Sequence, residues 1–198
     1  MKRSVLVLVL AGAAAVSGCA GQRRAVGHAP APPGDGVVRT AGCATATSPP
    51  AMSIDGTPQP ANQEALDEVA SRVQPRADKD FADVYAGLQL VQERDRIQVF
   101  RKPSAAFDRW IVHDFAADCV EVLDARYSAV ELTAMQQRIE HDMAYWQQHG
   151  VRITSIGADP TRGVVVVGTV DDQPARAQFP AHYPGLPVEV RHQDPVTW

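Results

Sequence analysis

The stretch SAVELTAMQQRIEHDMAYWQQHG, residues 128–150, predicts the longest helix of this chain and so determines the fold. Ser128 followed by Glu131 is the pattern of a capping box, in which both side chains satisfy backbone N–H groups at a helix start. Gly150 is the residue type that commonly ends a helix. The apolar residues between them fall on one helical face: Leu132, Met135, Ile139, Met143 and Trp146. We therefore expect a central core helix at about residues 128–149.

Predicted helices and strands alternate on both sides of this helix. On the N-terminal side we expect a helix from residue 66 that ends at Pro75, strands over residues 84–91 and 97–100, a helix capped by Ser104 and a strand over residues 120–123. On the C-terminal side we expect strands over residues 151–156 and 163–170, a short helix opened by Pro174 and a strand over residues 188–190. The N-terminal side thus has the order α-β-β-α-β, and the C-terminal side has the same order when the central helix is counted as its first element.

The two sides also match residue by residue. A shift of 68 residues places Ile97 on Val165, Val99 on Val167, Phe115 on Tyr183 and Val120-Glu121-Val122 on Val188-Glu189-Val190. The two predicted hairpins align only after a further shift of one residue. Short strands and helices in this order typically pack as helices on one face of a sheet. We expect an α+β, two-layer sandwich built from a duplicated α-β-β-α-β unit.

The N-terminus has the three parts of an export signal. Lys2 and Arg3 precede an apolar run over residues 5–16, which is shorter than the roughly 20 residues that a membrane-spanning helix needs. The run ends in Val16-Ser17-Gly18-Cys19, which resembles the lipobox of bacterial lipoproteins. The resemblance implies removal of residues 1–18 as a signal peptide, acylation of Cys19 by chains such as palmitate, and a lipid anchor on the outer face of the cell membrane. An ordinary cleaved signal peptide is the alternative.

Residues 19–61 are rich in Ala, Gly, Pro, Ser and Thr and contain scarcely any large apolar residue. Such a composition predicts a disordered linker, which would hold the following domain, residues 62–198, on the order of 35 Å from the membrane. The chain carries a net charge of −4 and has no basic stripe, which argues against nucleic acid as a partner.

Two cysteines remain if Cys19 is acylated. Cys43 and Cys119 would be an even pair in a compartment where disulfides persist, and bridging them would stabilise the domain by up to about 4 kcal/mol. Two separate thiols are the alternative, because Cys43 falls in the predicted linker.

No pattern in the sequence indicates an active site. The pairs His113-Asp114 and His141-Asp142 are adjacent on predicted helices, so their side chains diverge, and we interpret both pairs as solvated polar surface. Ser128 lacks the Gly-x-Ser-x-Gly context of a nucleophile and is explained as a helix cap. The histidines and cysteines show no zinc spacing. We expect a protein that is not an enzyme and has no cofactor.

Two stretches, YSAVELTAMQQRIE and GVRITSIGADPTRGVVVVGT, resemble the pro-region of secreted bacterial serine proteases of the α-lytic protease and streptogrisin type. The resemblance extends over roughly residues 81–192 and is most specific over residues 127–169. It implies an α+β module that assists folding of a protease and inhibits it, through a sheet edge and a C-terminal tail. The sequence departs from that family because it contains no protease domain and no Gly-Asp-Ser-Gly-Gly motif.

A further stretch, which overlaps the last one, is GVVVVGTVDDQPARAQF. It resembles BON domains, which are small α-β-β-α-β modules of the bacterial envelope. That resemblance implies binding of lipid or cell-wall components. The sequence thus predicts a non-enzymatic surface lipoprotein that binds a protein, as a chaperone or inhibitor of a secreted serine protease, with a BON-like envelope module as the alternative.

Overall fold

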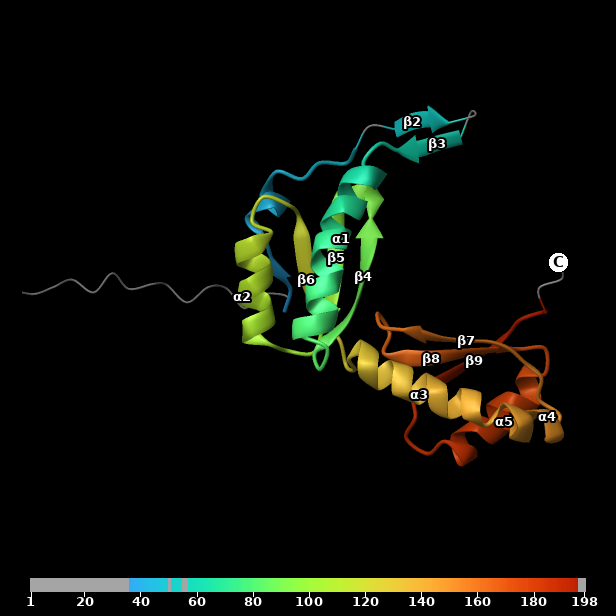
Figure 1. Ribbon diagram of the computed structural model, residues 1–198. Helices are drawn as coiled ribbons and strands as arrows, with labels where there is room; N and C mark the ends of the chain where they lie inside the picture. The colour runs from blue at the N-terminus through green and yellow to red at the C-terminus, as the bar shows by residue number, and fades with distance from the viewer. Residues whose placement is uncertain (1–35, 50, 55–56, 196–198) are drawn as a thin grey trace, which may run out of the picture. The chain divides into compact units, whose positions relative to one another are not determined.

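The computed structural model describes residues 36–49, 51–54 and 57–195. The predicted signal peptide and Cys19 lie outside that part of the chain. The described chain is an α+β protein with two mixed sheets, of four and three strands, and helices packed against them (Figure 1). The predicted α+β class is therefore confirmed.

The first module has the order α-β-β-α-β and contributes three strands of the four-stranded sheet. Its elements are α1 (Gln63–Asp80), β4 (Tyr85–Val91), the short 3-10 helix η2 (Gln92–Arg94), β5 (Arg96–Arg101), α2 (Ala105–Asp114) and β6 (Val120–Asp124). Strand β4 runs antiparallel to β5, and β5 runs parallel to β6. Ser104 caps α2 by accepting a hydrogen bond from the backbone N–H of Phe107, as predicted. Both helices bury their apolar side chains against the same sheet face, around Val73, Ile97, Val99, Phe107, Ile111, Val120 and Val122.

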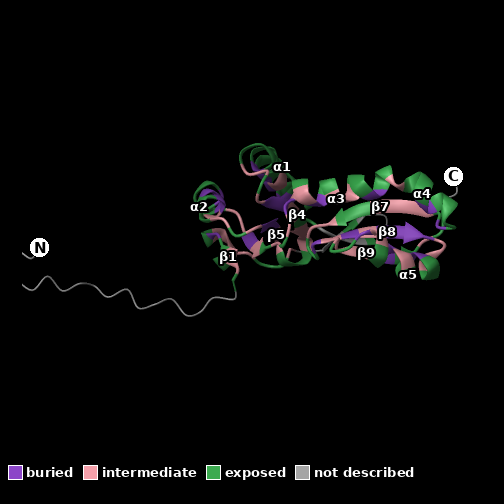
Figure 2. Cartoon of the chain, turned by 90° about the horizontal axis from the view of Figure 1, so that it is seen from below, coloured by how far each residue is buried: buried purple, intermediate pink, exposed green. Residues whose placement is uncertain are grey.

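The second module repeats this order with its own core. Its elements are α3 (Ala129–His141), α4 (Met143–Gln148), β7 (Ile153–Asp159), β8 (Val164–Thr169), α5 (Asp172–His182) and β9 (Val188–His192). The capping box of Ser128 and Glu131 is confirmed. In Figure 1 the helices α3, α4 and α5 lie on one side of the sheet formed by β7, β8 and β9. The buried residues between these layers include Ile139, Trp146, Val165, Val167, Phe179 and Tyr183, and the outward helix surfaces are exposed (Figure 2).

The two modules have the same strand register. Ile97 pairs with Val120 in the first and Val165 with Val188 in the second, so the partner numbers differ by 68 in both strands. The hairpins follow the same offset, including the bulge after Tyr85 in β4 and after Ile153 in β7. The predicted extra shift of one residue between the hairpins is therefore wrong: the bulges, which the sequence pattern does not reveal, occur at equivalent positions.

Two predicted helix boundaries are also wrong. Pro75 lies inside α1, which continues to Asp80, because Ala77 is fully buried in the core beyond the proline. The predicted single helix over residues 128–149 is interrupted at Asp142, where α3 ends and α4 begins. No helix in the described ranges has the length and apolarity required to cross a membrane.

Part of the predicted disordered linker, residues 19–61, has a defined structure. Strand β1 (Val38–Arg39) joins the four-stranded sheet beside β6, and a 3-10 helix η1 (Ala41–Ala44) follows it. Strands β2 (Ala51–Ile54) and β3 (Thr57–Pro60) pair as an antiparallel hairpin. The expectation of disorder therefore fails for these residues, which are held by partners distant in the sequence and by local pairing rather than by a core of their own.

Candidate functional site at the edge of strand β9

In the first module the outer edge of β6 is covered by β1. Val38 lies opposite Val122 in antiparallel register, and the backbone N–H of Thr40 donates to the carbonyl of Val120 over 3.1 Å. The Thr40 hydroxyl also accepts from the Val120 N–H over 2.9 Å. The backbone groups that β6 directs away from β5 are thus satisfied by β1 and Thr40.

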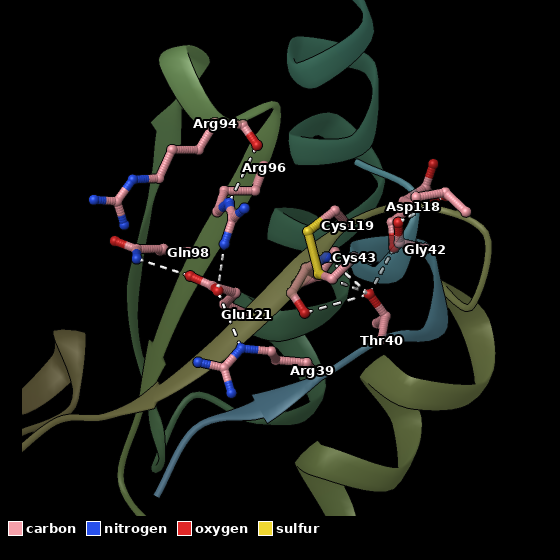
Figure 3. Close-up of a disulfide and its surroundings, with 12 residues drawn as sticks. Arg39, Thr40, Gly42, Cys43, Arg94, Arg96, Gln98, Asp118, Cys119 and Glu121 are labelled. Atoms are coloured by element: carbon pink, nitrogen blue, oxygen red, sulfur yellow. Dashed lines mark hydrogen bonds and ion pairs between the residues drawn. A yellow bond between two sulfur atoms is a disulfide. The ribbon is translucent and has the colours of Figure 1, made fainter. Parts of the chain in front are cut away.

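Side chains hold β1 on both faces of the sheet. On the helix-covered face, Val38 packs against the core cluster of the first module. On the opposite face, Nε of Arg39 lies 3.2 Å from Oε1 of Glu121, which also binds Arg96 (Figure 3). Burial would raise the pKa of Glu121, but hydrogen bonds from Gln98 and Arg39 outweigh this effect and lower the pKa below its usual value.

A disulfide fixes the segment that follows β1. Cys43 in η1 is bonded to Cys119, directly before β6, as Figure 3 shows. Gly42 lies beside the same turn, and its N–H donates to the carbonyl of Ala116 over 2.9 Å. Because the bridge spans a sequence separation of 76 residues, it ties the N-terminal segment to the first module.

In the second module the equivalent edge has no neighbouring strand within the described part of the chain. Strand β9 pairs with β8 alone among the described residues. The carbonyl of Pro187 and the N–H of Gln193 bond to β8, so the alternate residues Val190 and His192 direct their backbone groups away from it. Val190 corresponds, at the offset of 68, to Val122 of β6, which lies opposite Val38 of β1.

A pocket of about 320 Å³ lies beside this open edge, between α5 and β9. Its lining includes Phe179, Tyr183, Val188 and Val190. The equivalent residues of the first module, Ile111, Phe115, Val120 and Val122, belong to the cluster against which Val38 packs. The pocket therefore corresponds to the place where β1 adds an aliphatic side chain in the first module.

The opposite face of the sheet carries an alternating chain of charges at β9. Nε of Arg191 lies 2.6 Å from Oε1 of Glu189, and Oε2 of Glu189 contacts Arg162. Arg162 in turn lies 3.5 Å from Asp159. Both oxygens of Glu189 therefore have a cation, whereas Arg191 ends the chain with one carboxylate and is 53% exposed.

The residues considered as catalytic candidates do not form a common site. The predicted divergence of the two His-Asp pairs is wrong, because Nδ1 of His113 lies 2.7 Å from Oδ1 of Asp114 and Nδ1 of His141 lies 3.5 Å from Oδ1 of Asp142. Both imidazoles are nevertheless exposed, His113 in α2 and His141 at the end of α3. Ser128 is buried as the cap of α3. Within the described ranges, no cluster of His, Cys, Asp or Glu side chains has the arrangement of a metal site.

Asp142 corrects the interpretation of His141-Asp142 as solvated surface. Its Oδ2 accepts a hydrogen bond from the Tyr183 hydroxyl over 3.0 Å and lies 3.1 Å from Nε2 of His182. Tyr183 accepts in turn from the indole N–H of Trp146 over 2.9 Å. Burial, with Asp142 nearby, raises the pKa of Tyr183 to about 12. The group satisfies the buried indole and phenol and ties α4 to α5, which is a structural role.

Sequence reasoning missed the β9 edge as a site, although one signal pointed to it. The repeated triplets at residues 120–122 and 188–190 mark equivalent strands, but only the structure places β1 on the first of them. A comparison with family models and with curated proteins found no match to this chain.

Proposed function

We propose that this chain is a non-enzymatic module of the bacterial cell surface that binds an extended protein segment by strand addition at β9. The observation that carries the proposal is the open edge of β9, next to a pocket, at a position equivalent to the edge that β1 covers in the first module. Strand addition supplies affinity through main-chain hydrogen bonds and specificity through pockets for alternate side chains.

The fold is best explained as a duplicated two-layer α-β-β-α-β sandwich. The constant offset of 68 residues through three strands, and the equivalent bulges of the two hairpins, support this origin. Under duplication both modules inherit the same outer edge. One edge is then covered by the chain itself, and the other is available to a partner.

The partner that we propose is a secreted serine protease of the α-lytic protease and streptogrisin type. Residues 127–169, which resemble the pro-regions of those enzymes, include α3, α4, β7 and β8. The most specific part of the resemblance, which extends over roughly residues 81–192, therefore falls on the module that carries the open edge. The proposed location, on the outer face of the membrane through acylated Cys19, would present this edge to secreted proteins.

Titration of the full-length chain, purified in detergent, against chymotrypsin-like secreted bacterial proteases tests the proposal. We expect a stable complex or inhibition at micromolar concentration. His192→Pro removes an outward N–H without touching the bonds to β8, and we expect binding about tenfold weaker. His192→Ala, which keeps the N–H, is the matched control and should bind like the unchanged chain.

Two results would contradict the proposal, and a third would support the alternative function. Absence of any complex, or equal binding by the proline and alanine variants, would overturn strand addition to a protease at β9. Sedimentation of the unlipidated Cys19→Ala chain with liposomes, in the absence of protease binding, would support the BON-like alternative instead.

A further inference from the structure

The chemistry around β9 specifies the segment that this edge accepts, and the inference rests on the proposed strand addition. We infer that the incoming strand runs antiparallel to β9 and carries an acidic residue directly before a β-branched aliphatic residue. The direction follows from β1, which runs antiparallel to β6 at the equivalent edge. The side-chain preferences follow from the two faces of β9.

The aliphatic residue is specified by the pocket. A residue opposite Val190 in antiparallel register points to the same face as Val190, where the pocket lies between α5 and β9. In the first module that position is held by Val38, opposite Val122, packed against the core. Phe179, Leu186 and Val188 make the lining of this pocket mainly apolar, and an aliphatic side chain buries more apolar surface there than a short polar one would. Two charged residues, Arg176 and Glu189, also line the pocket.

The acidic residue is specified by the opposite face. The residue before the aliphatic one lies opposite Arg191, within cross-strand reach of its guanidinium. Arg191 is half-exposed and has a carboxylate partner only in Glu189, so far as the described chain extends. A carboxylate here would extend the alternating chain of charges that begins at Asp159.

The second module thereby differs from the first in the residue that follows the aliphatic one. In the first module Glu121 forms a salt bridge with Arg39, which comes from the added strand β1. In the second, both oxygens of Glu189 are already in contact with Arg162 and Arg191. A cation opposite Glu189 would meet a neutralised carboxylate, so the strand that suits β9 is not a copy of β1.

Capped synthetic peptides added to the full-length chain test this inference. The probes contain Glu-Val-Thr, Arg-Val-Thr or Glu-Asp-Thr within an otherwise identical strand-forming sequence. We expect the Glu-Val-Thr peptide to slow amide hydrogen exchange at Val190 and His192, which identifies the β9 edge and not β6. The Arg-Val-Thr and Glu-Asp-Thr peptides should bind about five- to tenfold more weakly, the first because of like charges at Arg191 and the second because aspartate lacks the aliphatic contact with the pocket.

Charge reversal separates recognition by Arg191 from a general effect on the strand. Arg191→Glu should invert the preference, so that the Arg-Val-Thr peptide binds more tightly than the Glu-Val-Thr peptide, and added salt should reduce both differences. Equal protection of β9 by all three peptides would overturn the inferred sequence preference while leaving strand addition intact. Failure of every peptide to protect Val190 and His192 would overturn both the preference and strand addition at this edge.

Discussion

Gly42 shows how closely the N-terminal segment approaches the first module. A Cβ atom at this position would lie 2.5 Å from the backbone carbonyl oxygens of Ala117 and Asp118, a contact that no rotamer change can relieve. We expect Gly42→Ala to lower the free energy of unfolding by about 1–3 kcal/mol, because the backbone of η1 or of the facing turn must shift. Urea unfolding followed by circular dichroism measures the change.

Gly157→Ala is the matched control for this substitution. Gly157 lies in β7, and a Cβ atom there would meet open space. Its unfolding midpoint should stay close to that of the unchanged chain. Equal midpoints for the two alanine variants would show that η1 does not need the close approach at Gly42.

Asp142 makes the stability of the second module depend on pH. Burial would raise the pKa of its carboxyl, but hydrogen bonds from His182 and Tyr183 outweigh burial and lower the pKa below its usual value. The folded chain then binds fewer protons than the unfolded chain near the unfolded pKa of about 4. The stabilisation is present above that pH and is lost as pH falls through the folded pKa.

We expect Asp142→Asn to reduce the loss of stability between about pH 5 and pH 3, measured as the slope of the unfolding free energy against pH. Other carboxylates with lowered pKa values, such as Glu121, keep part of the slope. Asp83→Asn changes an exposed carboxyl and serves as the control. An unchanged slope in the Asp142 variant would contradict the stabilising role of the bonds to His182 and Tyr183.

At the scale of elements, the docking of β1 and η1 depends on the disulfide as well as on hydrogen bonds. The bridge between Cys43 and Cys119 closes a loop with a sequence separation of 76 residues. Replacing both cysteines by serine should lower the free energy of unfolding by about 4 kcal/mol, chiefly through the greater chain entropy of the unfolded state. Reduction of the disulfide in the unchanged chain should likewise lower its melting temperature.

Two readouts distinguish loss of the bridge from general damage. Amide exchange at Val120 and Val122 should accelerate in the double serine variant, because β1 covers their outward backbone groups. Exchange in the second module should follow only the change in global stability. A melting temperature that does not respond to reduction would contradict the stabilising role.

The helices and strands of both modules were predictable wherever the apolar pattern is periodic. The capping box at Ser128 and the cap at Ser104 give local signals, and the structure contains both. The helix end predicted at Pro75 was wrong because the prediction used a local rule alone. The helix continues past the proline, where Ala77 is buried in the core. The break at Asp142 coincides with its bonds to His182 in α5 and to Tyr183 directly after it, some 40 positions away, which no local pattern contains.

The candidate site was less predictable than the fold for a similar reason. Val38 and Arg39 lie in a segment whose composition is that of a linker, and they become a strand only through contacts with β6 about 82 positions later. The openness of the β9 edge is likewise a property of the assembled sheet. Sequence repetition identifies equivalent strands, but it does not say which of them has a neighbour.

At the scale of the whole molecule, the two modules have the same strand arrangement and differ in what lies at its outer edge. In the first, the N-terminal segment completes the sheet and is locked by a disulfide. In the second, the equivalent edge, its pocket and Arg191 are accessible from outside. The proposed lipid anchor at the N-terminus would therefore connect to the module whose edge is already covered, and leave the proposed binding edge on the module that follows it.

The proposed anchor can be tested directly on the chain. We expect the full-length protein to sediment with membranes and to incorporate an acyl label, because each buried methylene contributes about 0.8 kcal/mol and two or more acyl chains give a stable tether. Cys19→Ala should lose both properties, whereas Ser17→Ala, which keeps the cysteine and a small residue before it, should retain them.

The chain has three cysteines, so acylation of Cys19 together with the bridge between Cys43 and Cys119 predicts no free thiol under denaturing, non-reducing conditions. Membrane association or acyl label that persists in Cys19→Ala would place the protein differently, and one titratable thiol per chain would show that Cys19 is not modified.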